Sequence, residues 1–113
     1  FKSNDFDYIL NISEDGWFGN SIGPYQHFAH NIFRSIESGK YILRSTNNGI
    51  AAIINTVGVV EKKINLNETD YIDFTESRKV NQTLFSQYGN KIFGIIILLY
   101  IFIIFSFNRI KNE

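Results

Sequence analysis

The sequence of 113 residues contains no cysteine, which excludes a disulfide, a thiolate metal ligand and a thiol nucleophile within it. It also contains no methionine and begins at Phe1. We therefore expect this chain to be a piece of a longer protein. Histidine is scarce as well, since His27 and His30 are the only two, and few residues remain that could carry acid–base chemistry.

An excess of either charge is also missing, because 11 basic residues balance 11 acidic ones. Proteins that bind nucleic acids usually gather a basic excess on one face. No run of basic residues in this chain is longer than the pair Lys62 and Lys63. We therefore predict that nucleic acid is not a partner.

The chain does have a long apolar run over residues 92–107 (IFGIIILLYIFIIFSF), which carries no charge. A helix of this length spans about 24 Å, and charged side chains at both ends can extend toward the headgroups of a bilayer about 30 Å thick. A helix on the surface of a soluble domain would show a polar face. We predict a transmembrane helix over residues 92–108, in preference to a buried core element. A signal peptide is excluded by the position of the run at the end of the chain.

Basic residues around this run indicate its orientation. Arg109 and Lys111 follow it, whereas only Lys91 directly precedes it. Basic residues accumulate on the cytoplasmic side of membrane helices, and acidic residues count little. We expect residues 109–113 to form a cytoplasmic tail and residues 1–90 to lie on the other side of the membrane.

The first part of the chain, residues 1–76, has the pattern of a mixed α/β domain, and residues 77–91 have the polar composition of a linker. Runs of β-branched and aromatic residues predict strands, and the sequences NNG at 47–49 and NTVG at 55–58 predict the turns between three of them. The expected strands cover residues 6–12, 41–45, 50–54, 59–64 and 71–75. Together with one helix, this order fits part of an α/β sandwich whose remainder lies elsewhere.

The expected helix covers residues 21–38. Ser21 could cap it, Pro24 suits its first turn and Gly39 suits its end. Apolar side chains recur at helical spacing and predict one face packed against the sheet. These side chains are Phe28, Ala29, Ile32, Phe33 and Ile36.

Few polar residues are good candidates for catalysis or metal binding. His27 and His30 are three apart on the expected helix and could share a face, but no third ligand is near them in the sequence, so we predict no metal site. No cofactor is implied either. Ser13, Glu14 and Asp15 are neighbours in the chain, and catalytic carboxylates need a defined separation and environment. We interpret these three as an exposed turn.

Two other groups are better candidates for a binding site. Trp17 and Phe18 lie in a loop between glycines, a setting in which large aromatic residues often form a binding wall. Arg44 ends a predicted strand and is followed by Asn47 and Asn48, which places several hydrogen-bond donors where loops gather over a sheet edge. The alternative for this second group is turn formation alone.

Four motifs resemble those of the apolipoprotein N-acyltransferases, in order and with compatible spacing over nearly the whole chain. They are residues 11–19 (NISEDGWFG), similar to N-x-(S/T)-(N/E)-D-(A/G)-W-F-G; 21–27 (SIGPYQH), similar to S-x-G-P-x-Q-H; 34–37 (RSIE), similar to R-x-x-E; and 43–50 (LRSTNNGI), similar to (L/V)-R-(S/A)-(T/S)-N-N-G-(I/V). The chain departs from the family at Leu84, where proline is common, and at Glu14, where asparagine is frequent.

The resemblance implies a multi-pass enzyme of the bacterial inner membrane with a periplasmic nitrilase-type domain, an αββα sandwich. Its reaction moves an acyl chain from a phospholipid to the α-amine of a diacylglyceryl-apolipoprotein. In the family a Cys carries the acyl chain as a thioester, a Glu is the general base and a Lys stabilises the oxyanion. All three are expected in the N-terminal remainder of the protein, so this chain alone is expected to be inactive.

Within the chain, the resemblance leaves five candidates for substrate-binding or active-site loop residues, namely Trp17, Phe18, His27, Arg44 and Asn47. Two other functions stay open. One is a different nitrilase-type amidase, which the apolar run at residues 92–107 disfavours. The other is a non-catalytic, membrane-anchored module, which the absence of cysteine favours.

Overall fold

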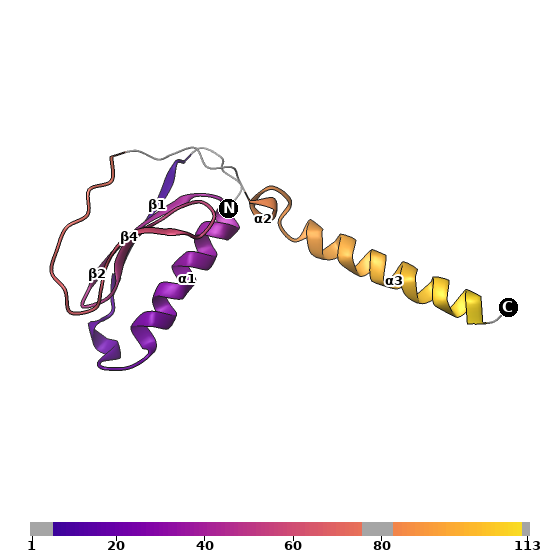
Figure 1. Cartoon of the computed structure of the whole chain (residues 1–113), viewed down its shortest axis with the longest axis horizontal. Helices are drawn as coiled ribbons and strands as arrows, with labels where there is room; N and C mark the ends of the chain where they lie inside the picture. The colour runs from indigo at the N-terminus through magenta and orange to yellow at the C-terminus, as the bar shows by residue number, and fades with distance from the viewer. Residues whose placement is uncertain (1–5, 76–82, 112–113) are drawn as a thin grey trace.

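The computed structural model describes residues 6–75 and 83–111. It contains a two-layer α/β unit and a long helix that projects away from it (Figure 1). In chain order the elements are β1 (Tyr8–Glu14), the 3₁₀ turn η1 (Gly16–Phe18), α1 (Gly23–Ser38), β2 (Tyr41–Asn47), β3 (Ala51–Ile54), β4 (Val60–Ile64), α2 (Leu84–Tyr88) and α3 (Lys91–Lys111). The mixed α/β class expected from the sequence is confirmed.

The four strands form one sheet in the order β1-β2-β3-β4. β1 and β2 are parallel, and α1 supplies the crossover that a parallel pair requires. The pairs β2–β3 and β3–β4 are antiparallel hairpins, as the two turn signals predicted. In the parallel register Glu14 lies opposite Asn47. The carboxyl ends of β1 and β2 therefore meet at the same edge, next to η1.

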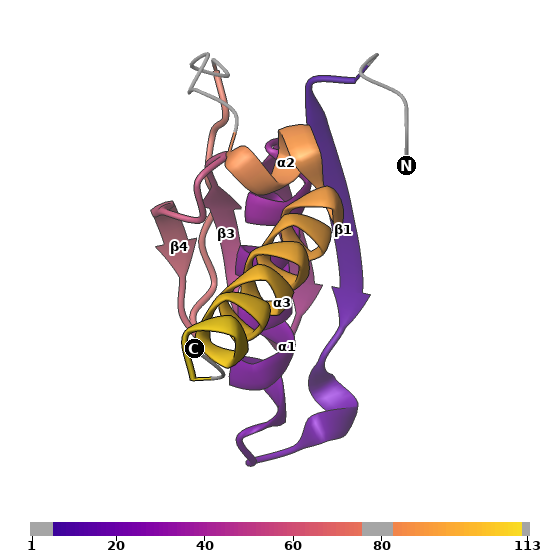
Figure 2. The ribbon, with the colours of Figure 1, turned by 90° about the vertical axis from the view of Figure 1, so that its right-hand side faces the viewer.

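The core lies between the sheet and α1, which covers one face of it (Figure 2). Ile42 and Ile54 are buried at its centre, and Phe28 and Ile32 of α1 pack against them. The prediction that Phe33 belongs to this face is wrong, because its side chain is 63% exposed. One residue step rotates a helix by about 100°, so Phe33 points away from the direction that Ile32 takes.

The ends of α1 agree with the sequence except at its start. The helix begins at Gly23, so Ile22 and not Ser21 is the cap residue. The Ser21 hydroxyl still accepts a hydrogen bond from the Gly23 N–H at 3.1 Å. At the other end Gly39 has a left-handed φ of 64° and donates its N–H to the Ser35 carbonyl, which is the usual role of glycine at this position.

The strand predicted over residues 71–75 does not form. The segment is extended, but it crosses the face of the sheet opposite α1 and pairs with no strand (Figure 1, left). Its aromatic residue Phe74 packs on Tyr41 and Tyr8, with ring centroids 5.5 and 6.2 Å apart. These side-chain contacts hold the segment in place, so Phe74 serves the packing of rings and not the pairing of strands.

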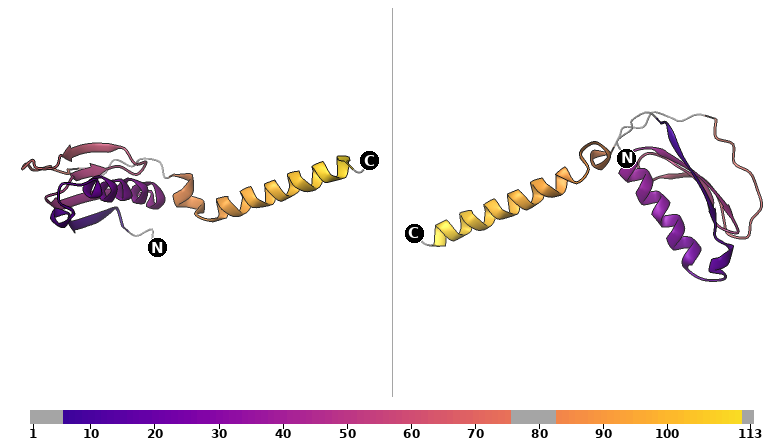
Figure 3. Two further views of the ribbon diagram at one scale, coloured as in Figure 1. Left: turned by 90° about the horizontal axis from the view of Figure 1, so that it is seen from below. Right: turned by 180° about the vertical axis from the view of Figure 1, so that it is seen from behind.

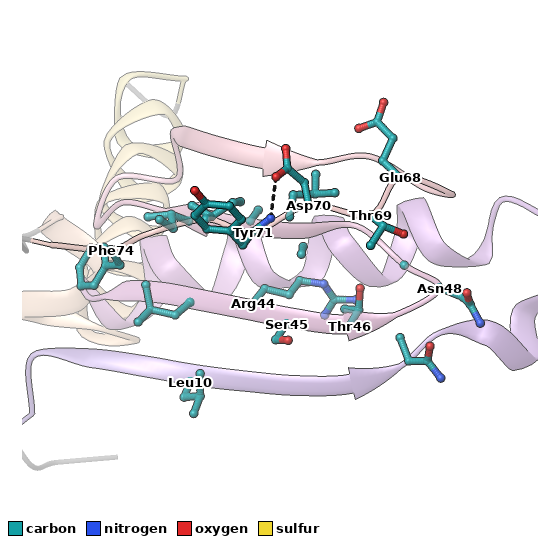
Figure 4. Close-up of a pocket in the computed structure, with 18 of the residues that line it drawn as sticks. Leu10, Arg44, Ser45, Thr46, Asn48, Glu68, Thr69, Asp70, Tyr71 and Phe74 are labelled. Carbon is teal, nitrogen blue, oxygen red and sulfur yellow. Dashed lines mark hydrogen bonds between the residues drawn. The ribbon is translucent and has the colours of Figure 1, made fainter.

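A cavity of about 770 Å³ lies between this crossing segment and the sheet. Figure 4 shows the strand residues Leu10 and Ser45 on one side of it and Tyr71 and Phe74 on the other. Leu10, which lines the cavity, has an exposed side chain. The sheet face opposite α1 is therefore only partly covered within the described residues.

The expected linker at 77–91 contains a short helix in its described part. α2 is joined to the end of α1, because the Thr83 hydroxyl donates to the Ile36 carbonyl at 2.6 Å and accepts from the Ser86 N–H at 3.1 Å. Leu84, where the resembling family usually has proline, is the first residue of α2. Proline is tolerated at a first helical position, so the departure does not conflict with this helix.

The C-terminal apolar run is helical, as expected, and the helix is longer than the predicted 92–108. α3 covers Lys91–Lys111, and its stretch Lys91–Arg109 is long and apolar enough to cross a membrane, with a mean hydropathy of 2.2. It projects away from the sheet and from α1 in both views of Figure 3. Its apolar side chains are accordingly exposed in this structure.

Candidate functional site

The five candidate residues lie around the carboxyl ends of β1 and β2, and a residue that was not a candidate connects them. Asp15 follows the last residue of β1, and its side chain is 0% exposed. Its Oδ2 accepts from Arg44 Nη2 at 2.7 Å, and its Oδ1 accepts from His27 Nδ1 at 2.7 Å. The prediction of an exposed turn is therefore wrong for Asp15, which is buried, and also for Ser13 and Glu14, which belong to β1.

Arg44 reaches Asp15 from β2, and its side chain is also 0% exposed. Its Nε donates to the Ile50 carbonyl at 3.1 Å, and its Nη1 donates to the Asn11 Oδ1 at 2.7 Å. Burial lowers the pKa of Arg44, and the nearby Asp15 carboxylate acts in the opposite direction. Because an arginine side chain stays protonated in proteins, the two form a buried ion pair with a defined geometry.

The turn after β2 leaves room for this ion pair. Asn48 takes a left-handed φ of 52°, which asparagine tolerates. A Cβ at Gly49 would collide with the Asp15 carboxylate and would stand 2.7 Å from the Thr46 hydroxyl oxygen. The NNG sequence therefore does more than form a turn, because its glycine lets the backbone approach the buried charges.

His27 connects the ion pair to the aromatic loop. It lies near the start of α1, its side chain is 35% exposed, and its ring centroid is 5.8 Å from that of Phe18. A carboxylate can only accept, so Nδ1 carries the proton in the contact with Asp15. His30 is exposed on the same helix and does not join this cluster. No group of three or more potential metal ligands occurs within residues 6–75 and 83–111.

Trp17 and Phe18 form a stacked pair at the tip of η1, with ring centroids 4.1 Å apart. The Trp17 Nε1 donates to the Glu14 carbonyl at 2.9 Å, yet the residue is 75% exposed. Phe18 lies against the backbone of Gly23, where a Cβ would collide with its ring. These two contacts hold the aromatic pair in place, and the exposed Trp17 ring presents an apolar surface.

Asn47 contributes at the same edge through Glu14. Its Nδ2 donates to Glu14 Oε2 at 2.6 Å, and the other carboxylate oxygen accepts from the Gly16 N–H at 2.7 Å. Glu14 therefore joins the ends of the two parallel strands to the beginning of η1. This acidic residue stands where the resembling family often has asparagine, and its carboxylate has two defined partners here.

The alternation of polar residues toward the end of β1 is a sequence signal for the role of Asp15. Asn11 and Ser13 in β1 and Asp15 directly after it are two positions apart, and alternate residues of a strand point to the same face. In the structure Asn11 accepts from Arg44, and the Ser13 hydroxyl donates to Asp15 Oδ1 at 3.2 Å. Polar side chains that face a core require partners. The Asp15 carboxylate finds them in Ser13, Arg44 and His27.

Comparison with known proteins agrees with this architecture. The family model of the carbon-nitrogen hydrolases matches residues 1–83, and the chain belongs to that family. The curated relatives are apolipoprotein N-acyltransferases. That of Rickettsia bellii is 47% identical over 108 residues, which is 95% of this chain and 21% of the relative. That of Rickettsia prowazekii is 42% identical over 108 residues, covering 95% of this chain and 22% of the relative.

A third relative, the apolipoprotein N-acyltransferase of Haemophilus ducreyi, is 40% identical over 84 residues, which is 74% of this chain and 17% of the relative. The chain thus spans about a fifth of the length of the curated relatives it matches. The family expected from the four motifs is confirmed.

Proposed function

We propose that this chain forms part of an apolipoprotein N-acyltransferase, namely an active-site loop, its supporting sheet and helix, and one transmembrane helix. The enzyme would transfer an acyl chain from a phospholipid to the α-amine of a diacylglyceryl-cysteine. The observation that supports a role in this reaction is the stacked pair of Trp17 and Phe18. The pair is apolar, Trp17 is exposed and the half-buried Phe18 supports it, which suits contact with an acyl chain.

The proposed reaction has two steps. A cysteine thiol in the remainder of the enzyme gives its proton to the general base, and the resulting thiolate attacks the acyl ester of the phospholipid. The thioester forms as the ester C–O bond breaks, and the leaving oxygen takes the proton from the base, which releases a lysophospholipid. The α-amine of the acceptor then attacks the thioester, an amide forms, and the thiol returns as the amine loses its proton. This chain contains no cysteine, so by itself it would not carry out either step.

The remainder of the same protein would cover the open parts of the sheet. Within the described residues β1 pairs with β2 alone, so its other edge is free. Leu10 and Ile12 are exposed on β1. An unpaired strand edge beside exposed apolar side chains favours association with further chain.

The proposed membrane arrangement places residues 1–90 in the periplasm, α3 across the inner membrane and residues 109–113 in the cytoplasm. The basic residues Arg109 and Lys111 support this direction. Fusions after Glu113 test it. We expect a green fluorescent protein to be fluorescent there and an alkaline phosphatase to be inactive; the opposite pattern would reverse the orientation.

A chimera tests the proposed activity. In it, this chain replaces the matching segment of the Rickettsia bellii relative, and the purified protein is assayed for acyl transfer from a phospholipid to a diacylglyceryl peptide. We expect Trp17→Ala to lower the rate about tenfold or more, as truncation of a central aromatic contact does. Tyr25→Ala is the control, because Tyr25 is an exposed aromatic residue of α1 that does not belong to the Trp17–Phe18 pair.

The outcomes separate the candidate functions. An inactive chimera that is folded and inserted in the membrane would contradict the acyltransferase role of this chain. Hydrolysis of simple amides without transfer to the peptide would favour the amidase alternative. Equal rates for the Trp17 and Tyr25 variants would remove the aromatic pair from the site and leave the assignment of the chain intact.

A further inference from the structure

We infer that Asp15, His27 and Arg44 are positioning residues that fix the Trp17–Phe18 pair at the carboxyl end of β1. This inference rests on the proposed function for its catalytic consequence, and on the structure alone for its geometry. We name the three residues the Asp15 cluster. They come from the end of β1, the start of α1 and the middle of β2, so together they join three elements.

In the ion pair of Asp15 and Arg44, every side-chain nitrogen and carboxylate oxygen has a hydrogen-bond partner. Arg44 donates to the carboxylate of Asp15, to the side chain of Asn11 and to the backbone carbonyl of Ile50. Each of its three nitrogen atoms has a partner, and the Asp15 carboxylate has partners on both oxygens. An ion pair with all of these bonds has essentially one arrangement, because any displacement would leave a buried charge without a partner.

Stability alone does not explain the buried ion pair of Asp15 and Arg44. The cost of removing two charges from water often exceeds their attraction, and apolar residues of similar size commonly stabilise a protein as well or better. A buried ion pair does supply a defined geometry. Asp15 directly precedes η1, and its backbone also takes part, since its N–H donates to the Asn47 carbonyl at 3.1 Å and its carbonyl accepts from the Phe18 N–H at 3.1 Å.

A continuous series of contacts connects the ion pair of Asp15 and Arg44 to the exposed ring of Trp17. Asp15 binds His27 at 2.7 Å, His27 lies beside Phe18 at 5.8 Å between ring centroids, and Phe18 stacks on Trp17 at 4.1 Å. Without His27, Phe18 would lose the neighbour on this side of its ring. The position of the exposed Trp17 therefore depends on a residue that it does not contact.

His27 offers the clearest test, because it is the most exposed member of the Asp15 cluster and its loss leaves the Arg44–Asp15 pair intact. In the Rickettsia bellii chimera we compare His27→Ala with His30→Ala, which alters an exposed histidine on the same helix. A third variant, His27→Asn, keeps an amide donor at the position of the His27 Nδ1 that contacts Asp15. The kinetic parameters kcat and KM for the phospholipid donor are measured together with the thermal midpoint of each variant.

We expect His27→Ala to lower kcat/KM about tenfold at a temperature at which every variant is still folded, and the lost hydrogen bond to a charged group to lower the thermal midpoint somewhat. His27→Asn is expected to restore most of the rate, and His30→Ala to match the parent. Full activity of the His27→Ala chimera would overturn the inference while the proposed function stands. A rate that falls only in parallel with the thermal midpoint would mark a purely structural role and would overturn it as well.

A second measurement does not need catalysis. Chymotrypsin cleaves after exposed aromatic residues, and the bonds after Trp17 and Phe18 lie in the loop that the Asp15 cluster is inferred to hold. We expect cleavage there to be about tenfold faster in His27→Ala than in His30→Ala. Equal cleavage rates would overturn the inference even if the parent chimera has no acyltransferase activity, which would count against the proposed function separately.

Discussion

The carboxyl end of the β1–β2 pair and the helix α3 are organised in opposite ways. The first buries two charged side chains, Asp15 and Arg44, and gives their polar atoms defined partners. The second exposes a continuous apolar surface without charge between Lys91 and Arg109. The arrangement of the first region depends on individual hydrogen bonds, and the character of α3 depends on its average hydropathy. Substitutions should therefore have very different effects in the two regions.

The difference follows from the surroundings that each region needs. A buried charge is costly unless its partners stay in place, so a loss of one hydrogen bond at Asp15 is felt. In a helix that crosses a membrane, as proposed for α3, an apolar side chain has many equivalents, because a bilayer core accepts any apolar residue in a similar way.

The largest effect is expected for Arg44→Met. This change leaves the Asp15 carboxylate buried without its counter-ion, which costs about 3–5 kcal/mol. The thermal midpoint of unfolding of the Rickettsia bellii chimera measures this loss. Arg34→Met is the matched control, because Arg34 forms an exposed pair with Glu37 at 3.0 Å, and such pairs contribute about 0.3–0.5 kcal/mol. Similar losses for both variants would contradict the special role of Arg44.

A charge in the middle of α3 is expected to cost somewhat less. Leu99→Asp places a carboxylate near the centre of the candidate span, where insertion becomes less favourable by about 3 kcal/mol. The fraction of this chain that resists alkaline extraction from membranes measures the effect. Leu99→Ile should behave like the parent. If the aspartate variant stays fully in the membrane, α3 is held there by something other than its own hydropathy.

Glycine substitutions compare the two regions directly. Gly49→Ala would press a methyl group against the Asp15 carboxylate, and overpacking of this kind costs about 1–3 kcal/mol. A Cβ at Gly94 in α3 meets nothing within 4 Å, so Gly94→Ala should be neutral or slightly stabilising. Thermal denaturation of the two chimeras decides the matter. An equal loss of stability at both glycines would show that Gly94 is packed as closely in the whole protein as Gly49 is.

The smallest effect is expected between α1 and α2, where the α/β unit continues toward α3. Thr83 caps α2 and bonds to the end of α1, and loss of a helix cap costs about 1 kcal/mol. Thr83→Ala should lower the thermal midpoint of the chimera slightly, and Thr83→Ser, which keeps the hydroxyl, should not. A decrease of the same size in both variants would assign the effect to the methyl group and not to the cap.

Much of the fold could be predicted because its signals are local. The apolar run that became α3, the helix ending at Gly39 and the two hairpin turns each depend on residues close together in the chain. The failures involve contacts between distant residues. The strand expected over 71–75 is absent because Phe74 packs on Tyr41 and Tyr8, and a propensity for extended backbone does not distinguish ring packing from strand pairing.

The candidate site divides in the same way. The motifs selected Trp17, Phe18, His27, Arg44 and Asn47, and the structure places all five around the carboxyl ends of β1 and β2, where their role in binding stays a prediction. Asp15 was misjudged because its neighbours Ser13 and Glu14 made it look like part of an exposed turn. Its burial depends on Arg44, 29 positions away in the chain, which no local pattern reports.

The α/β order, the family with its four spaced motifs and the apolar character of α3 could be read from the sequence, since they depend on composition and local spacing. The meeting of Asp15, His27 and Arg44 could be seen only in the folded chain. Their meeting requires the parallel register of β1 and β2 and the crossover through α1. Non-local pairing of this kind sets where buried charges find their partners, and it thereby sets where the aromatic loop is held.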